Sequence, residues 1–291
     1  MKTITAYLRT FRKKYLPLIK SPQTFLLLLT GLAGYMTARC PIFNLTMLLS
    51  AAGSFFLAIS GSTVLNMWYD RDIDAQMPRT CKRPLAQKTL LPRQAFAFGA
   101  LMAGAGVIWA LWIDGLFGLI IFSGLFFNVI IYTIWLKRRT AWSILWGGIA
   151  GGMPILAGRA LGLGRIDWIG LTLALAILFW IPTHILTFSI RYHADYQSAR
   201  IPTFPSTYGF QATRRIIAFS TILAALAMCL SAYGVGMTWG SLRLLALLSA
   251  VLFFFAVRSM INPSEKINLG LFKYASLYMM GAMLLLVITG M

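Results

Sequence analysis

Four of the seven acidic side chains in the chain fall in two short polar stretches. Asp70, Asp72 and Asp74 lie together in the first stretch, and Asp195 lies in the second. If one helix runs through the first stretch, Asn66, Asp70 and Asp74 are spaced four residues apart and form one stripe of oxygen atoms. Magnesium prefers oxygen ligands, often one or two carboxylates together with substrate phosphates. We therefore predict a magnesium–diphosphate site along the stripe of Asn66, Asp70 and Asp74.

The acidic stripe would be unfavourable without a ligand. Like charges four residues apart destabilise an exposed helix by about 0.2–0.5 kcal/mol, and a bound cation reverses that effect. A solvated loop with no ligand is the simpler alternative. On a continuous helix Asp72 points away from the stripe, so we expect it to pair with Arg71 or Arg79, or to bind a second metal.

Basic residues accompany the acids. Arg79, Lys82 and Arg83 follow the first stretch, and a further basic run begins at Lys137. Arginine and lysine beside a metal-bound diphosphate would neutralise its remaining charge and help it to leave. Membrane topology alone is the alternative explanation for any one of them.

The elements that must position these residues are predicted to be membrane-spanning helices. The chain is 59% hydrophobic and 11% charged, and apolar runs long enough to cross a bilayer recur along it. A large soluble helical protein would need polar outer faces, which these runs lack. We predict nine spans, at 23–40, 43–66, 94–113, 115–136, 141–162, 167–190, 214–236, 239–257 and 270–290.

The net charge of +19 is explained by topology. With these spans, 22 of the 26 Lys and Arg residues fall on one side of the membrane, and Arg39, Arg159, Arg165 and Arg243 fall on the other. The positive-inside rule then places the N-terminus and the basic loops in the cytoplasm and the C-terminus on the outer side. Little charge is left to indicate a nucleic-acid partner, and we predict none.

We divide the chain into two parts. Residues 1–22 form a basic segment, and an amphipathic helix over 1–20 is expected to lie in the membrane interface. Residues 23–291 form a single transmembrane domain. Its catalytic loops are expected at about 67–93 and 191–213.

At this point the motifs match a known family. Residues 66–85 follow the pattern NxxxDRDIDxxMxRTxxRPL. This run resembles the first aspartate-rich motif of the UbiA superfamily of intramembrane prenyltransferases, in the form found in protoheme IX farnesyltransferases (heme O synthases). The segments 137–140, 147–154, 180–184 and 195–205 are similar to further motifs of that subgroup.

The resemblance implies an all-α integral membrane fold, with about nine helices around a central cavity that opens to lipid. It also implies Mg²⁺-dependent transfer of a farnesyl group from farnesyl diphosphate to heme B, giving heme O. The catalytic residues would be Asp70, Asp74, Asp195 and His184, and Asp195 would join Asn66, Asp70 and Asp74 as a magnesium ligand. The substrate-binding residues would be Asn66, Arg79, Lys82, Arg83, Lys137, Arg138, Arg191 and Tyr196.

Some positions depart from the superfamily pattern. Many members carry a second motif DxxxD, but here Arg191 takes the first position and only Asp195 remains. Thr183 and Arg200 replace a proline and a glycine of the heme-related motifs. His184 is an intramembrane ionisable residue, which fits heme contact or acid–base work as well as a packing role. These departures leave the acceptor open.

Three alternatives are considered. A UbiA-type enzyme could instead act on an aromatic quinone precursor or a glycerol phosphate lipid. A transporter would place ionisable residues or broken helices near the bilayer midplane, whereas the acids here collect at the predicted cytoplasmic ends of the spans. A structural membrane subunit leaves the acidic stripe without a purpose.

Overall fold

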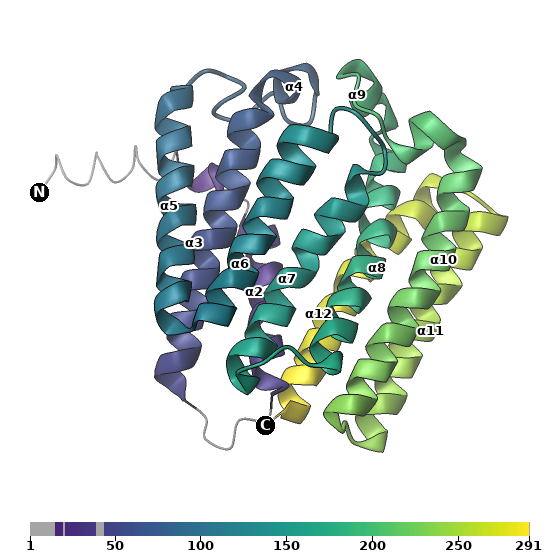
Figure 1. Cartoon of the computed structure of the whole chain (residues 1–291). Coiled ribbons are helices and arrows are strands. Elements are labelled where there is room, and N and C mark those ends of the chain that lie inside the picture. Colours follow the sequence, from purple (N-terminus) through teal and green to yellow (C-terminus); the bar gives the residue numbers. More distant parts are fainter. Residues whose placement is uncertain (1–14, 20, 39–43, 291) are drawn as a thin grey trace, which may run out of the picture.

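The protein is a bundle of long helices (Figure 1), seen in a computed structural model that describes residues 15–19, 21–38 and 44–290. Every regular element in these ranges is helical, which confirms the all-α class. The elements are η1 (Leu16–Leu18), α2 (Ser21–Met36), α3 (Leu45–Tyr69), α4 (Arg71–Gln76), α5 (Pro92–Ile113), α6 (Gly115–Phe126), η2 (Phe127–Leu136), α7 (Ser143–Leu163), α8 (Trp168–Arg191), α9 (His193–Ser198), α10 (Phe204–Val235), α11 (Trp239–Ile261) and α12 (Glu265–Gly290).

Eight helices of the described residues are long and apolar enough to cross a membrane, and α6 continues into η2 as one of them. The remaining predicted span corresponds to α2, which has 16 residues and is about 24 Å long at 1.5 Å per residue. It packs against α3, α7 and α12 in the bundle. The protein is therefore an integral, multi-pass membrane protein.

Two predicted spans were too short because the helices begin earlier in the chain. The span predicted at 214–236 belongs to α10, which begins at Phe204 because Thr203 and Ser206 form a capping box there. Gly209 then kinks α10 with φ 81° and ψ 164°, a conformation that is essentially restricted to glycine. The last span, predicted at 270–290, belongs to α12, which begins at Glu265.

The helices α2 and α7 approach each other more closely than side chains would allow. A Cβ atom added to Gly158 would lie 1.9 Å from the carbonyl oxygen of Gly31, and one added to Gly34 would lie 2.1 Å from that of Ile155. Gly61 brings α3 equally close to the backbone of α5. Small residues at such crossings are typical of helix packing in membranes, where van der Waals contact drives association.

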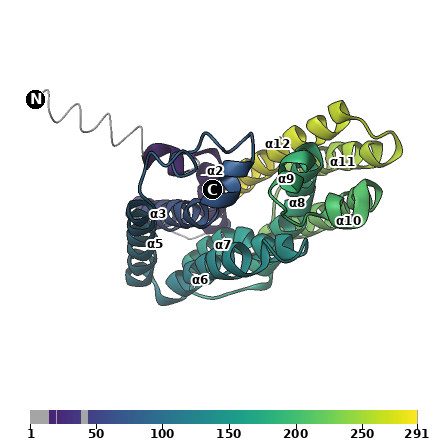
Figure 2. The same cartoon turned by 90° about the horizontal axis from the view of Figure 1, so that it is seen from above.

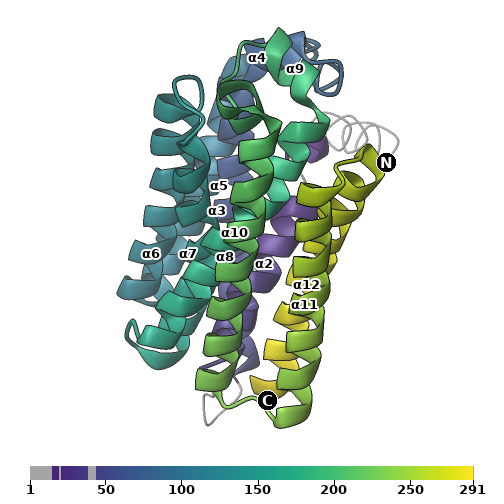
Figure 3. The ribbon, with the colours of Figure 1, turned by 90° about the vertical axis from the view of Figure 1, so that its right-hand side faces the viewer.

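The two polar stretches meet at one end of the bundle. Figure 3 shows α4 and α9 side by side there, while α12 ends at the opposite end. Buried contacts among Ile73, Met77, Ala199 and Ile201 join the two segments. Seen from above, α7 and α8 lie between the α3–α5 side and the α10–α11 side (Figure 2). The two basic loops that contain α4 and α9 thus share one end of the bundle.

At the other end, a buried ion pair holds three segments together. Arg159 is 5% exposed and donates two hydrogen bonds of 2.8 Å to Asp167 and one of 2.7 Å to the carbonyl of Thr37. Asp167 also caps α8, and Asp114 caps α6. Both acids at this end are therefore helix caps, and Asp167 is also the ion-pair partner of Arg159.

Little of the predicted amphipathic segment at 1–20 can be compared, because residues 1–14 and 20 lie outside the described residues. Within 15–19, Leu18 is fully buried, and the ring of Tyr15 packs edge-on against Phe98 at 4.9 Å between centroids. The central cavity implied by the family resemblance stays a prediction.

Candidate active site at the junction of α3 and α4

The acidic stripe begins on α3 and bends at Asp70. Helix α3 ends at Tyr69, Asp70 is a joint with ψ 3°, and α4 starts at the next residue. The backbone bonds Asp70 N–H to Asn66 O (3.0 Å) and Asp74 N–H to Asp70 O (2.8 Å) remain on either side of the joint. The expectation of one straight helix was therefore wrong, although the four-residue hydrogen-bond spacing is kept.

Asp70 is the most deeply buried acid of the site, with 1% of its surface exposed. Lys137, which follows η2, donates a short hydrogen bond from Nζ to Asp70 Oδ2. Burial acts to lower the pKa of Lys137, but the charge of Asp70, the neighbouring phenol of Tyr132 and the hydrogen bond to Asp70 together outweigh it, so this pKa lies above its ordinary value. Asp70 Oδ1 is buried and has no hydrogen-bond partner among the described residues. One oxygen of this carboxylate is thus paired and the other is left for a ligand.

Asp74 and Arg83 form the second ion pair. One guanidinium nitrogen, Nη1, donates to both carboxylate oxygens at 2.8 and 2.7 Å. The hydroxyl of Thr80 donates to the backbone carbonyl of Asp74 at 2.9 Å, which folds the loop after α4 back onto it. Asp74 is 5% exposed, so the loop holds this carboxylate buried against its base.

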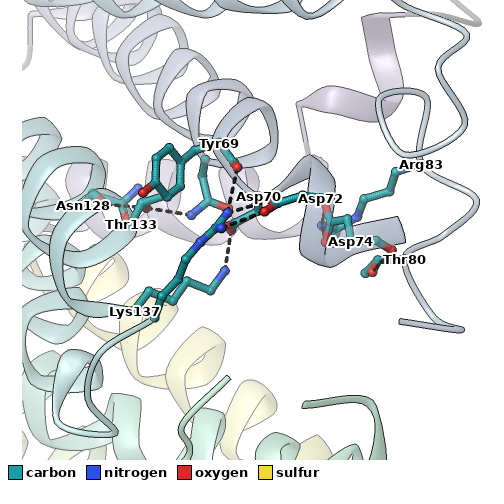
Figure 4. A network of polar contacts seen from close by, with 11 residues as sticks. Tyr69, Asp70, Asp72, Asp74, Thr80, Arg83, Asn128, Thr133 and Lys137 are labelled. Atoms are coloured by element: carbon teal, nitrogen blue, oxygen red, sulfur yellow. Dashed lines mark hydrogen bonds and ion pairs between the residues drawn. The ribbon is translucent and has the colours of Figure 1, made fainter. Parts of the chain in front are cut away.

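Asp72 pairs with Arg138, not with Arg71 or Arg79, so that part of the prediction was wrong. Two guanidinium nitrogens donate to its two oxygens at 2.7 Å each, and Nη2 also donates to the carbonyl of Tyr69 at 3.0 Å. The hydrogen bond from Arg138 is the main cause that lowers the pKa of Asp72. Figure 4 shows Asp72 beside Asp70. Arg138 therefore fastens the joint between α3 and α4.

Two polar residues at the site were missed by the sequence reasoning. Asn66 Nδ2 donates to Thr133 Oγ1 at 2.8 Å, and Asn128 Nδ2 donates to Ser62 Oγ at 2.7 Å. Asn128 and Thr133 come from η2, a π-helix, and approach α3 in Figure 4. The sequence did contain a signal for Asn128 and Thr133, because both are polar residues within a strongly apolar span. Such side chains are costly in a membrane unless they have a partner or a function.

The second polar stretch makes a looser contact with the first. Arg79 Nε lies 4.0 Å from Asp195 Oδ2. The Arg79 guanidinium also lies over the rings of Phe188 (4.8 Å) and Tyr192 (5.2 Å). Arg191 is exposed and lies 5.5 Å from the Tyr192 ring. Arg79 is therefore the base that links the first stretch to Asp195.

Three other candidates take different positions. Tyr196 packs against the buried contacts between α4 and α9; burial raises the pKa of its phenol, and the charges of Lys137 and Arg79 oppose that rise. Lys82 is exposed on the loop. His184 lies within α8, stacked between Trp180 and Phe272 at 5.0 and 4.5 Å between ring centroids, so its contact with an acceptor stays a prediction.

The oxygen ligands that the protein offers fit a metal ion whose remaining ligands come from the substrate diphosphate and water. Among the described residues no three His, Cys, Asp or Glu side chains gather closely enough to hold an ion, and each acid of the site faces a base. Magnesium is commonly bound by one or two carboxylates while phosphates and water complete its shell. The buried, unpartnered Oδ1 of Asp70 suits such an ion. Asn66, Asp74 and Asp195 complete the predicted ligands.

Comparison with known proteins decides the family. The sequence model of the UbiA prenyltransferase family matches residues 27–279. The chain belongs to the UbiA prenyltransferase family. It is similar to the protoheme IX farnesyltransferase of Archaeoglobus fulgidus, with 41% identity over 268 residues that cover 91% of this chain and 93% of the relative. With that of Korarchaeum cryptofilum, identity is 40% over 206 residues, covering 71% and 69%.

Solved structures share the fold of this UbiA prenyltransferase. A digeranylgeranylglyceryl phosphate synthase matches with a TM-score of 0.79 at 19% identity, covering 96% of this chain and 98% of the other. A UbiA homolog from Archaeoglobus fulgidus bound to GPP and Mg²⁺ matches with a TM-score of 0.68 at 15% identity, covering 94% and 99%. At these identities the likeness establishes the fold. The family match and the relatives of 40–41% identity show that the chain is an enzyme, a prenyltransferase.

Proposed function

We propose that this enzyme transfers the farnesyl group of farnesyl diphosphate to heme B and forms heme O, with Mg²⁺ as cofactor. Relatives named protoheme IX farnesyltransferase, at 40–41% identity, support the acceptor and the prenyl length. The motif at 66–85 supports the same subgroup. The basic end of the bundle, with α4 and α9, faces the cytoplasm in this proposal, and α12 ends on the outer side.

The reaction has three bond changes. The allylic C1–O bond of farnesyl diphosphate breaks, and diphosphate leaves with the electron pair. A vinyl carbon of heme B bonds to farnesyl C1, and water adds at the carbon beside the porphyrin with loss of a proton. The product carries a hydroxyethylfarnesyl side chain. The difficult step is the first, because negative charge accumulates on the departing diphosphate while a carbocation forms.

The observation that carries the proposal is the set of acid–base pairs at the junction of α3 and α4. Asp70 with Lys137, and Asp74 with Arg83, each join a carboxylate suited to a metal with a base suited to a phosphate. When bound, magnesium supplies positive charge to the diphosphate oxygens and makes diphosphate a better leaving group. The bases then neutralise the charge that the metal leaves uncompensated.

The remaining residues serve binding and orientation. Arg79 lies over two α8 rings beside Asp195, where it can bring the second stretch to the same diphosphate. Arg138 holds Asp72 and the end of α3, so its proposed role is to position Asp70. Lys82, Tyr196 and Arg191 are proposed as outer contacts of the substrates, and His184 as the residue nearest the heme.

The test is a direct conversion. Purified protein in detergent is incubated with Mg²⁺, farnesyl diphosphate and heme B, and the pigment is extracted for mass spectrometry. We expect the mass of the hydroxyethylfarnesyl product, and its loss when EDTA replaces Mg²⁺. Turnover of a hydroxybenzoate or of a glycerol phosphate lipid without any heme product would overturn the acceptor and keep the family.

A further inference from the structure

The side-chain amide of Asn66 is held in one orientation by a chain of hydrogen bonds. Asn66 Nδ2 donates to Thr133 Oγ1 at 2.8 Å, and Thr133 Oγ1 donates to the backbone carbonyl of Asn128 at 2.7 Å. Thr133 is fully buried and Asn66 is 8% exposed. The chain therefore runs from amide to hydroxyl to carbonyl inside the protein, away from competing water.

The chemistry of the hydroxyl decides the orientation. A threonine hydroxyl has one proton to donate, and a backbone carbonyl can only accept. Because Thr133 donates its proton to Asn128, it can only accept from Asn66. The NH₂ branch of the planar amide must face Thr133, and the oxygen branch must face the other way. A flipped Asn66 would bring two acceptors together in a buried place, which is costly.

The π-helix provides the acceptor for that hydroxyl. In an ordinary α-helix a threonine hydroxyl bonds the carbonyl three or four residues earlier, whereas in η2 the acceptor is five residues earlier, at Asn128. The backbone N–H of Lys137 likewise bonds the carbonyl five residues earlier, at Tyr132. The wider turn thus places both Thr133 and Lys137 against the end of α3. Single π-turns are frequent at functional sites.

We infer that Thr133 is a positioning residue that directs the amide oxygen of Asn66 to the metal–diphosphate complex. The inference rests on the proposed function, in which Asn66 and Asp70 are ligands one helical turn apart. Asp70 reaches its base, Lys137, through the same π-helix. The π-helix η2 therefore positions both residues that act on the candidate ligands: Thr133 orients Asn66, and Lys137, which follows η2, neutralises Asp70.

The test measures metal binding, so it does not depend on turnover or on the acceptor. Mn²⁺ replaces Mg²⁺ and is titrated by electron paramagnetic resonance in the presence of farnesyl S-thiolodiphosphate, an analogue that resists ionisation. Thr133→Val keeps the shape and removes the hydroxyl. We expect its Mn²⁺ affinity to fall about ten- to a hundredfold, as is usual when a residue that orients a ligand is lost. Thr133→Ser keeps the hydroxyl and should stay close to the wild type.

The matched control is Thr30→Val on α2. Thr30 is also buried, and its hydroxyl donates to the carbonyl of Leu27 in its own helix, so the same chemical change occurs away from the site. Its Mn²⁺ affinity should be unchanged. Equal affinity of Thr133→Val and the wild type, or equal loss in Thr133→Ser and Thr133→Val, would overturn the inference.

A second variant tests the orientation itself. Asn66→Asp carries oxygen on both branches, so orientation no longer matters, and adding Thr133→Val should change the Mn²⁺ affinity less than about twofold in this background. A full additional loss would contradict the inference. A wild type that binds no Mn²⁺ would overturn the metal site and the inference together, whereas normal Mn²⁺ binding without heme product would overturn only the acceptor.

Discussion

The junction of α3 and α4 and the segment of α8 and α9 differ in how firmly they hold their acids. At the first, Asp72 and Asp74 accept hydrogen bonds of 2.8 Å or less from arginines, and Asp70 accepts a short one from Lys137. At the second, Asp195 lies 4.0 Å from Arg79 and its side chain is 16% exposed. The acids of the first region are already held by their bases without a ligand, whereas the second region makes only a long contact with the first.

The difference has an energetic meaning. A buried carboxylate is costly unless it is paired, and removing one partner of a buried pair costs about 3–5 kcal/mol. Exposed pairs contribute about 0–1 kcal/mol. The buried acids Asp70 and Asp74 of the first region are therefore expected to be sensitive to any single change. The exposed pair of Asp72 and the contacts of the second region should tolerate several changes. Substitutions ordered by their expected effect test this comparison.

The largest effect is expected from Asp70→Asn. The change removes the carboxylate charge from the candidate metal site and leaves Lys137, whose side chain is 17% exposed, without its partner. We therefore expect kcat to fall about 10³-fold, as for loss of a major electrostatic group. Product formation is measured at saturating Mg²⁺. Asp114→Asn, which keeps a cap on α6 at the far end of the fourth span, serves as the control. Full activity of Asp70→Asn would refute the metal assignment.

Arg83→Ala should have the next largest effect. It removes a candidate diphosphate contact and leaves the 5%-exposed Asp74 unpaired, so kcat/KM should fall about 10²-fold and thermal unfolding in detergent should shift downward. The double variant Asp74→Ala/Arg83→Ala should regain part of the lost stability, because no unpaired charge remains. If the stability losses of Asp74→Ala and Arg83→Ala add up to the loss of the double variant, the two residues are not coupled.

Asp195→Asn should cost less, about tenfold or below in kcat/KM, because its contact with Arg79 is long and partly exposed. We expect the change mainly in KM for farnesyl diphosphate, measured at fixed Mg²⁺. A loss as large as that of Asp70→Asn would mean that the two regions are equally important, and would remove the distinction drawn here.

Arg191→Asp should have the smallest effect, within about twofold in activity, because the side chain is exposed. It restores the carboxylate that many superfamily members carry at this position. The Mg²⁺ concentration for half-maximal activity is the measurement. A large decrease in that concentration would show that α8 can supply a second strong ligand, and that the looseness of the second region comes from this one position.

Much of the fold and part of the site could be predicted from the sequence. Long apolar runs define spans without tertiary information, and the residues of 66–85 are close enough in sequence to be read as one site. The partner of Asp72 could not be predicted, because Arg138 is distant in the chain and reaches it only through the packing of η2 on α3. The joint at Asp70 and the π-helical turn were also invisible, since their hydrophobic patterns match those of ordinary helices.

The contact of α2 with α7 has a consequence for how the chain is assembled. Gly31 and Gly34 complete their packing only when Gly158 and Ile155 of α7 are present, and about 120 residues separate these contacts in the chain. At a synthesis rate of 5–20 residues per second, roughly 6–25 s pass between the insertion of one helix and that of the other. During that interval the glycine face of α2 is open to lipid or to any other helix that fits it. A chaperone or insertase that shelters this face would raise the yield of folded enzyme.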